Sequence, residues 1–155
     1  MASAPPNPSL SEILGEQIVC SESLIGILES ERNALVSGDV EALETVCKTK
    51  AAAAQRLFQL GEQMKIFVAA GLKGAEVEAL LARHPNGSTL VEQWRHLTAL
   101  ATRCSEANRA NGAMVEAREV QVRGALAAMQ PEAPAVYGRT GINKPSLPGR
   151  VFSRA

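Results

Sequence analysis

Two histidines and three cysteines are the side chains of this 155-residue chain best suited to catalysis or metal binding. His84 and His96 lie outside any HExxH, GxSxG or ExxH pattern, so neither is placed as a metal ligand or as a catalytic base. Cys20, Cys47 and Cys104 form no CxxC pair and lie far apart in the sequence. We therefore expect no catalytic residues, no metal and no cofactor. We interpret the cysteines as small buried hydrophobic residues inside helices.

The C-terminal segment 131–155 is the other place where charged side chains are concentrated. It carries one acidic and four basic residues, whereas residues 1–38 carry five acidic residues and one basic residue, and the net charge of the chain is zero. The sequence GRTGINKPS at 138–146 is not a phosphate-binding loop, because its lysine does not follow the last glycine. Four bases could neutralise about four phosphates without reading a base sequence, so we expect no nucleic-acid partner.

Helical periodicity extends over almost the whole chain before this segment. Apolar residues recur three and four positions apart, only 3% of the residues are aromatic, and no stretch alternates with the period of a strand. The pattern predicts an all-α fold, an elongated antiparallel helical bundle with three long helices and one short connecting helix. The predicted helices are 9–37, 40–70, 74–84 and 89–129.

Proline and glycine mark the limits of the bundle domain, which we place at residues 9–130. Residues 1–8, MASAPPNP, contain three prolines and are expected to be disordered. Gly38 predicts the end of the first helix, and Asp39 predicts the N-cap of the second. Two prolines follow the last helix closely, so residues 131–155 are expected to form a flexible basic tail.

Each long helix carries an apolar stripe that predicts its buried face. The stripe of the first helix is interrupted by three polar residues, Gln17, Ser21 and Glu31. In the last helix, for which Ser88 is a candidate N-cap, the stripe starts at Trp94 and alternates steps of three and four residues. The stripe residues are Leu10, Leu14, Leu24, Leu28 and Leu35 in the first helix; Leu43, Cys47, Ala54, Leu57, Met64 and Val68 in the second; and positions 94, 97, 101, 104, 108, 111, 115, 118, 122, 125 and 129 in the last.

Asn108 and Asn111 interrupt the stripe of the last helix, and Gly112 follows them at a cost of about 1 kcal/mol relative to alanine. Buried asparagines need hydrogen-bond partners, so these side chains either fix the register of the helices or pair across an interface. The alternative is that they bind water where the bundle is frayed. The stripe continues through Val115 and Val122 beyond the reach of the shorter helices, which predicts an exposed apolar face for a partner.

The order of these segments resembles the FlgN family of flagellar export chaperones. The resemblance covers residues 10–141 and includes ILESERNALVSGDVEAL at 27–43 and GLKGAEVEALLARHP at 71–85. The long last helix then carries an NxxNG element, and a YGxxG element follows it. The matching residues are Asn108, Asn111 and Gly112 for the first element, and Tyr137, Gly138 and Gly141 for the second.

The resemblance implies a cytoplasmic binding protein without enzymatic activity. Members of this family hold the aggregation-prone ends of hook-associated proteins, which form the hook–filament junction, and dock on the cytoplasmic domain of the export gate. By resemblance, clients bind the C-terminal part of the last helix, and gate docking involves Tyr137, Gly138 and Gly141. Residues 142–155 depart from the family pattern and receive no role. The candidate client-binding residues are Asn108, Asn111, Met114, Val115, Val122, Leu126 and Met129.

An alternative from another class is a structural coiled-coil or adaptor protein that self-assembles without a client. In that case the exposed stripe would pair with itself, whereas a chaperone is expected to be a monomer or a weak homo-oligomer. Nothing in the sequence resembles a signal peptide, and no run of about 18 apolar residues occurs, so we expect no membrane span.

Overall fold

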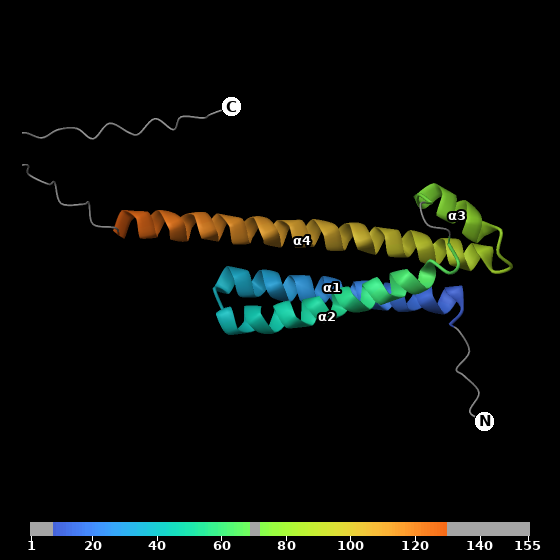
Figure 1. Ribbon diagram of the computed structural model, residues 1–155, viewed down its shortest axis with the longest axis horizontal. Coiled ribbons are helices and arrows are strands. Elements are labelled where there is room, and N and C mark those ends of the chain that lie inside the picture. The colour runs from blue at the N-terminus through green and yellow to red at the C-terminus, as the bar shows by residue number, and fades with distance from the viewer. Residues whose placement is uncertain (1–7, 69–71, 130–155) are drawn as a thin grey trace, which may run out of the picture. The chain divides into compact units, whose positions relative to one another are not determined.

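The computed structural model describes residues 8–68 and 72–129. Within these ranges the chain forms four helices and no strand (Figure 1): α1 (Leu10–Ser37), α2 (Val40–Met64), α3 (Gly74–Ala82) and α4 (Gly87–Met129). The chain divides into two units, residues 1–118 and residues 119–155. The first unit contains α1, α2, α3 and most of α4; in the second, the structure describes the last turns of α4. The prediction of an all-α helical bundle with one short connecting helix is confirmed.

The ends that the sequence predicts to be disordered fall almost entirely outside the described residues. Of the predicted N-terminal segment 1–8 the structure describes Pro8 alone, and none of the predicted basic tail 131–155 is described. The predicted domain limits at 9 and 130 therefore stay predictions.

Short-range hydrogen bonds define both ends of α1. Ser9 and Glu12 form a capping box, in which the Ser9 backbone N–H donates to Glu12 Oε2 at 2.7 Å and the Glu12 N–H donates to Ser9 Oγ. These bonds favour the ionised carboxylate and lower the pKa of Glu12. Gly38 ends the helix with a positive φ of 74°, a conformation that a side chain would strain. Asp39 then caps α2 by accepting the Ala42 N–H at 3.0 Å, so the predicted reversal of the chain is confirmed.

The second helix ends at Met64, before the predicted end at residue 70. The N–H groups of Lys65, Ile66 and Phe67 donate to the carbonyls three residues earlier in the chain. This is the hydrogen-bond pattern of a 3₁₀ turn, so the α-helix ends here. Periodicity alone does not reveal this change, because apolar residues continue through Val68. The prediction for 65–68 was therefore wrong, and residues 69 and 70 lie outside the described residues.

The start of α4 is set by its contact with α3 instead of by the predicted N-cap at Ser88. Gly87 is buried and is the first residue of α4, so Ser88 lies inside the first turn. A Cβ atom on Gly87 would lie 2.5 Å from the carbonyl oxygen of Ala82 in α3. Only glycine, which has no Cβ atom, fits this close to Ala82. The first turn of α4 is closed by a hydrogen bond from the Leu90 N–H to the Asn86 carbonyl.

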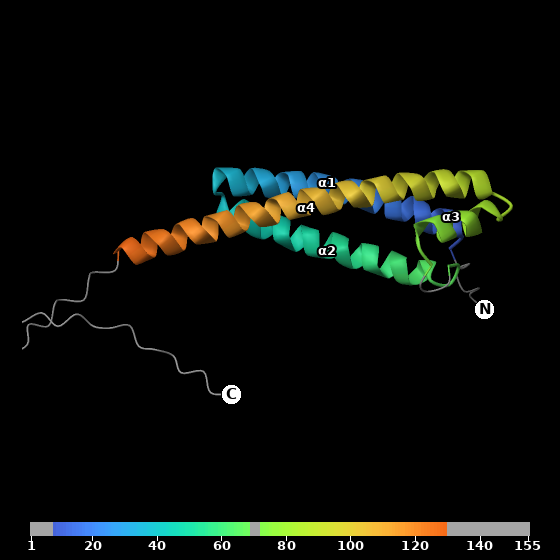
Figure 2. The same cartoon turned by 90° about the horizontal axis from the view of Figure 1, so that it is seen from above.

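Within the first unit, α1 contacts both other long helices, and Figures 1 and 2 show α2 beside it and α4 running along it. The contacts of α1 with α4 join residues 82 or 83 positions apart, so these two helices run parallel. Along α1, Glu16, Cys20 and Glu31 contact residues of α2 with decreasing numbers. These partners are Arg56, Ala53 and Lys50, so the two helices are antiparallel. The α1–α4 bonds are Gln93 Nε2 to Ser11 O, Cys104 Sγ to Ser21 O, Asn111 Nδ2 to Leu28 O and Arg118 Nη2 to Val36 O.

A buried apolar cluster joins the first turns of α1 to the other three helices. Leu10, Leu14, Leu28 and Leu35 of the predicted α1 stripe are buried, and Ile13, which that stripe omits, is among the most deeply buried side chains. The short helix α3 closes this end of the core with two of its apolar side chains. The cluster comprises Leu10, Ile13, Leu14, Met64, Val77, Leu81 and Leu90.

The buried face of α2 differs from the predicted stripe. Cys47 and Ala54 are exposed, whereas Leu60 is almost completely buried. Residues 51–54 are all alanine, so apolar side chains occur on every side of this helix and the spacing fits two faces equally well. Met64 of the predicted stripe is buried and Leu43, Leu57 and Val68 are half-buried, so the stripe was right at these positions and wrong at Cys47 and Ala54.

The buried face of α4 is also rotated relative to the predicted stripe. Ala101, Asn108 and Val115 are exposed, and Leu100 is buried in place of Ala101. The prediction was right at Trp94, Leu97, Cys104 and Asn111, which are buried or half-buried, and wrong at Ala101, Asn108 and Val115. These three residues form an exposed row on α4.

The reactivity of the three cysteines tests which faces of α1, α2 and α4 are buried. Burial raises the pKa of Cys20 and of Cys104, whereas Cys47 lies exposed on α2. Because the thiolate is the reactive form, we expect Cys47 to react with a disulfide reagent at pH 8 at least about ten times faster than the other two. Peptide mass spectrometry after timed labelling measures the three rates. Cys47→Ser should remove the fast phase, and equal rates for all three thiols would contradict the register of α2.

Candidate functional site

A buried polar cluster joins the three long helices in the C-terminal third of α1. Glu31 of α1 is only 8% exposed, and both of its carboxylate oxygens lie 2.9 Å from Lys50 Nζ of α2. Asn111 of α4 is 3% exposed and donates through Nδ2 to Glu31 Oε2 at 2.8 Å and to the Leu28 carbonyl at 2.9 Å. One carboxylate therefore receives hydrogen bonds from both neighbouring helices.

This cluster separates the roles of the two asparagines. Asn111 finds its partners inside the bundle, on Glu31 and Leu28 of α1, as expected of a buried asparagine that fixes the helix register. Asn108 is exposed, so it is not the second buried asparagine that the sequence pattern indicated. The buried side chain of Asn111 is therefore not accessible to another protein, whereas the exposed side chain of Asn108 is.

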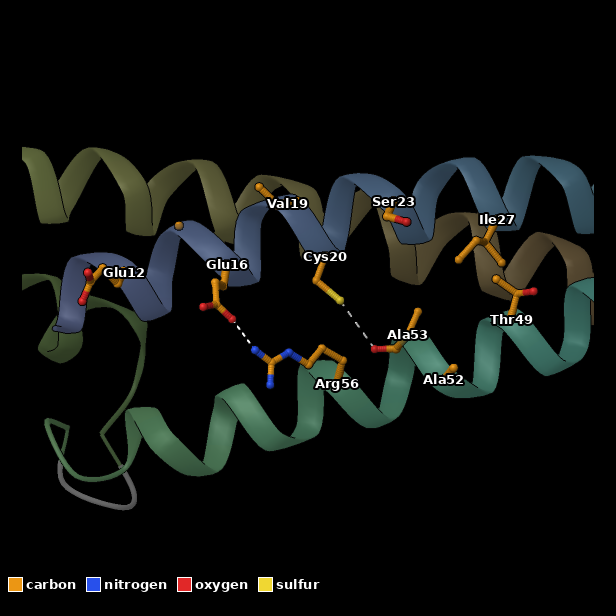
Figure 3. Close-up of a pocket in the computed structure, with 11 residues that line it drawn as sticks. Glu12, Glu16, Val19, Cys20, Ser23, Ile27, Thr49, Ala52, Ala53 and Arg56 are labelled. Carbon is orange, nitrogen blue, oxygen red and sulfur yellow. Dashed lines mark hydrogen bonds and ion pairs between the residues drawn. The ribbon is translucent and has the colours of Figure 1, made fainter. Parts of the chain in front are cut away.

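Three grooves follow the pairwise boundaries between the long helices in the first unit. The groove between α1 and α2 has a volume of about 680 Å³ and is mostly apolar (Figure 3). Two contacts span it: an ion pair joins Glu16 to Arg56, and Cys20 Sγ donates to the Ala53 carbonyl at 3.6 Å.

The groove between α1 and α4 is smaller and charged. Its volume is about 400 Å³, and its lining includes Glu29, Arg32, Arg103 and Glu106. Because both signs of charge alternate along it, this groove suits water better than an apolar segment.

The third groove lies between α2 and α4 over side chains of α1, and we call it the α2–α4 groove. Its volume is about 480 Å³, and Leu57 of α2 faces Trp94 and Ala101 of α4. Gln17 and Ser21 contribute to its floor. None of the residues that line it carries a charge. Sequence reasoning missed this groove, because its lining comes from three helices and includes only Leu57 of α2.

The predicted client-binding residues on α4 differ in exposure. In the first unit Met114 is half-buried and Val115 is 41% exposed. In the second unit Val122, Leu126 and Met129 are exposed, and Met129 reaches 79%. Within the second unit, Leu126 follows Val122 by four residues and Met129 follows Leu126 by three, which places these three apolar side chains on one face of the helix.

The other residues that could do chemistry are not brought together. His84 and His96 are both exposed, and His96 Nε2 lies 3.9 Å from Glu22 Oε1. Among residues 8–68 and 72–129, no three histidine, cysteine, aspartate or glutamate side chains are grouped to hold a metal ion. No helix in the same ranges is long and apolar enough to cross a membrane. The predicted docking residues Tyr137, Gly138 and Gly141 lie outside the described residues.

Comparison with protein families decides the assignment. The model of the family described as FlgN protein matches residues 7–145. The chain belongs to the FlgN family. This family comprises flagellar export chaperones, so the resemblance seen in the sequence is confirmed. No curated protein and no solved structure matches the chain.

The FlgN match covers the four helices that the structure describes and extends through Tyr137, Gly138 and Gly141. A flagellar export chaperone has to offer a surface to another protein. In this FlgN protein the surfaces that stand out are the exposed apolar face of α4 from Val115 to Met129 and the uncharged α2–α4 groove.

The role of the polar cluster predicts different effects for the two asparagines. Asn111→Ala removes two hydrogen bonds, one of them to a buried carboxylate, so we expect it to lower the free energy of unfolding by about 1–3 kcal/mol. Asn108→Ala is the matched control and should change that free energy by less than about 0.5 kcal/mol, because Asn108 is exposed. Urea unfolding followed by circular dichroism measures both. Equal effects of the two substitutions would contradict the structural role of Asn111.

Proposed function

We propose that this FlgN protein binds the hook–filament junction proteins in the cytoplasm, keeps their terminal segments from aggregating, and delivers them to the cytoplasmic domain of the export gate. The observation that carries the proposal is the apolar face of α4 formed by Val115, Val122, Leu126 and Met129. Large apolar side chains at this spacing and exposure are typical of a helix that accepts an amphipathic partner.

The chemistry of this face suits reversible binding. Fully burying one valine, leucine or methionine side chain contributes about 1.5–3 kcal/mol. Part of this gain is offset by the ordering of a client segment that was disordered before it bound. The balance favours moderate affinity, which a chaperone needs if it is to release its client at the gate.

Two further residues of α4 fit the same proposal in different ways. Met114 and Met129 have unbranched, flexible side chains that adapt to different surfaces, so they support the recognition of more than one junction protein. Asn108 is exposed on this helix and can offer hydrogen bonds to a client. Asn111 contributes indirectly, by holding the register of α4 against α1.

The proposal for gate docking rests on the family match. That match extends through Tyr137, Gly138 and Gly141, which we assign to gate docking because they form the YGxxG element after the last helix. Tyrosine suits such a contact, because its ring can be buried while its hydroxyl keeps a hydrogen bond.

Acidic substitutions on the α4 face test client binding. Val122→Asp combined with Met129→Asp should weaken capture of a purified junction protein by about tenfold to a hundredfold, because two carboxylates replace apolar contacts. Isothermal titration calorimetry measures the affinity, and circular dichroism verifies that helicity is kept.

Val120→Asp is the matched control for this test. Val120 is also exposed, but it lies two residues, or about 200° around the helix, from Val122. We expect its affinity for the client to stay within about twofold of the wild type. Undiminished capture by the double variant would contradict the assigned face. A stable dimer of the wild type in light scattering, with no client bound, would favour the self-assembling alternative.

Substitution of Tyr137 tests gate docking separately from client binding. Tyr137→Ala should keep the affinity for junction proteins and lose most of the binding to the purified cytoplasmic domain of the gate. Tyr137→Phe retains the ring and should fall between the alanine variant and the wild type if the hydroxyl contributes a hydrogen bond. A pull-down in which Tyr137→Ala binds the gate normally would reject the role of this residue.

A further inference from the structure

Asn111 is followed directly by Gly112, and the structure gives no packing reason for this glycine. A glycine inside a helix is less stable than an alanine, and Gly112 lies in the interior of α4. Its φ is not positive. Apart from its chain neighbours and the backbone of its own helix, nothing lies within 4 Å of where a Cβ on Gly112 would stand. An alanine would therefore fit at position 112, and the glycine points to a role other than packing.

Asparagine followed by glycine is the sequence most prone to spontaneous deamidation. The backbone nitrogen of the glycine attacks the side-chain carbon Cγ of the asparagine, ammonia leaves, and a five-membered succinimide ring forms. Water then opens the ring to aspartate or isoaspartate, so the reaction needs no reagent other than water. Glycine favours the ring closure because it has no side chain to crowd the attacking nitrogen.

The folded first unit holds Asn111 away from this reaction. Within the α-helix the Gly112 nitrogen belongs to the hydrogen-bond ladder, where its N–H faces the carbonyl four residues earlier. The Asn111 amide nitrogen donates to the Leu28 carbonyl at 2.9 Å and to Glu31 Oε2 at 2.8 Å, and the residue is only 3% exposed. Both constraints have to be released before the Gly112 nitrogen can reach Cγ, so the reaction requires α4 to detach from α1 around Asn111.

We propose that Asn111 is a self-modification site, closed while α4 packs on α1 and reactive when α4 detaches, whose product prevents α4 from packing again. Deamidation replaces the amide donor Nδ2 by a carboxylate oxygen, which can only accept. At this position the new carboxylate would lie against Glu31, whose cationic partner among the described residues is Lys50. Two buried carboxylates at hydrogen-bond distance repel each other, so the contact that sets the register is lost. The inference goes beyond the proposed chaperone function and does not depend on it.

Peptide mass spectrometry of the full-length chain follows the asparagines separately. Trypsin cleaves after lysine and arginine, so Asn86, Asn108 and Asn111 fall in three peptides, which are 84–95, 104–109 and 110–118. In the chain unfolded by urea, Asn111 and Asn86 should deamidate at rates within about threefold of each other, because a glycine follows both. Asn108 precedes Arg109 and should react at least about tenfold more slowly.

The native chain measures the gate. There the rate at Asn111 should fall at least about tenfold below its rate in urea, because only the detached state reacts. The ratio of the two rates then gives the fraction of time for which the site is open. Equal rates in the folded and unfolded chains would overturn the gate. An Asn111 that stays intact in urea while Asn86 reacts would overturn the site itself.

A pair of glutamates on α1 tests what closes the site. Glu31→Ala removes a hydrogen-bond partner of Asn111 and should raise its deamidation rate in the native chain at least about fivefold. Glu29 is exposed and is not among the partners of Asn111, so Glu29→Ala should leave the rate within about twofold. Equal rates in the two variants would show that this contact does not hold the site closed. If circular dichroism shows that Glu31→Ala does not fold, the folded and unfolded wild type decide.

Two further substitutions separate the chemistry from its consequence. Gly112→Ala has room in the helix and should lower the rate at Asn111 in urea at least about tenfold. Asn111→Asp supplies one of the products directly and should lower the Tm by at least about 4 °C, whereas Asn108→Asp should leave the Tm within about 2 °C. An unchanged rate in the Gly112→Ala chain would overturn the assigned reaction. An Asn111→Asp chain with the Tm of the wild type would overturn the block on repacking.

Discussion

The buried carboxylate of Glu31 is the interaction on which the arrangement of the first unit depends. It lies where α1 meets both other long helices, and it receives hydrogen bonds from Lys50 of α2 and Asn111 of α4. A buried ion pair often adds little net stability, because removing two charges from water costs about as much as their attraction returns. Here the contact fixes the rotation of the helices about their axes, because a rotation of α2 or α4 would remove a hydrogen-bond partner from the buried carboxylate. The exposed positions of α4 and the walls of the α2–α4 groove both follow from the register that this contact fixes.

This polar contact is needed because the apolar pattern alone leaves the register open. Alanine is abundant on α2 and α4, and only 3% of the chain is aromatic, so few large side chains interlock in one arrangement. On α4 the predicted stripe includes Ala101 and Val115, which are exposed, whereas Leu100, outside that stripe, is buried. A single buried asparagine with two partners separates the alternatives, in the way that one polar core residue sets the register of a coiled coil.

Local chemistry made part of this fold predictable from the sequence. Gly38 and Asp39 act through bonds to residues a few positions away, so the end of α1 and the start of α2 could be predicted correctly. The start of α4 could not, because Gly87 is required by a contact with Ala82 of another helix. The same limit applies to the candidate site. The apolar spacing of Val122, Leu126 and Met129 is visible in the sequence, whereas the α2–α4 groove exists only once three helices have met.

The chemistry of α4 differs along its length in a way that suits a chaperone. In the first unit Asn111 donates to Glu31 and to the Leu28 carbonyl of α1, and hydrogen bonds of this kind tolerate little change in geometry. Val122, Leu126 and Met129 are exposed and carry no such requirement, because valine, leucine and methionine side chains accept apolar surface of many shapes. Directional polar contacts therefore hold the helices together, and adaptable apolar area is left for a partner.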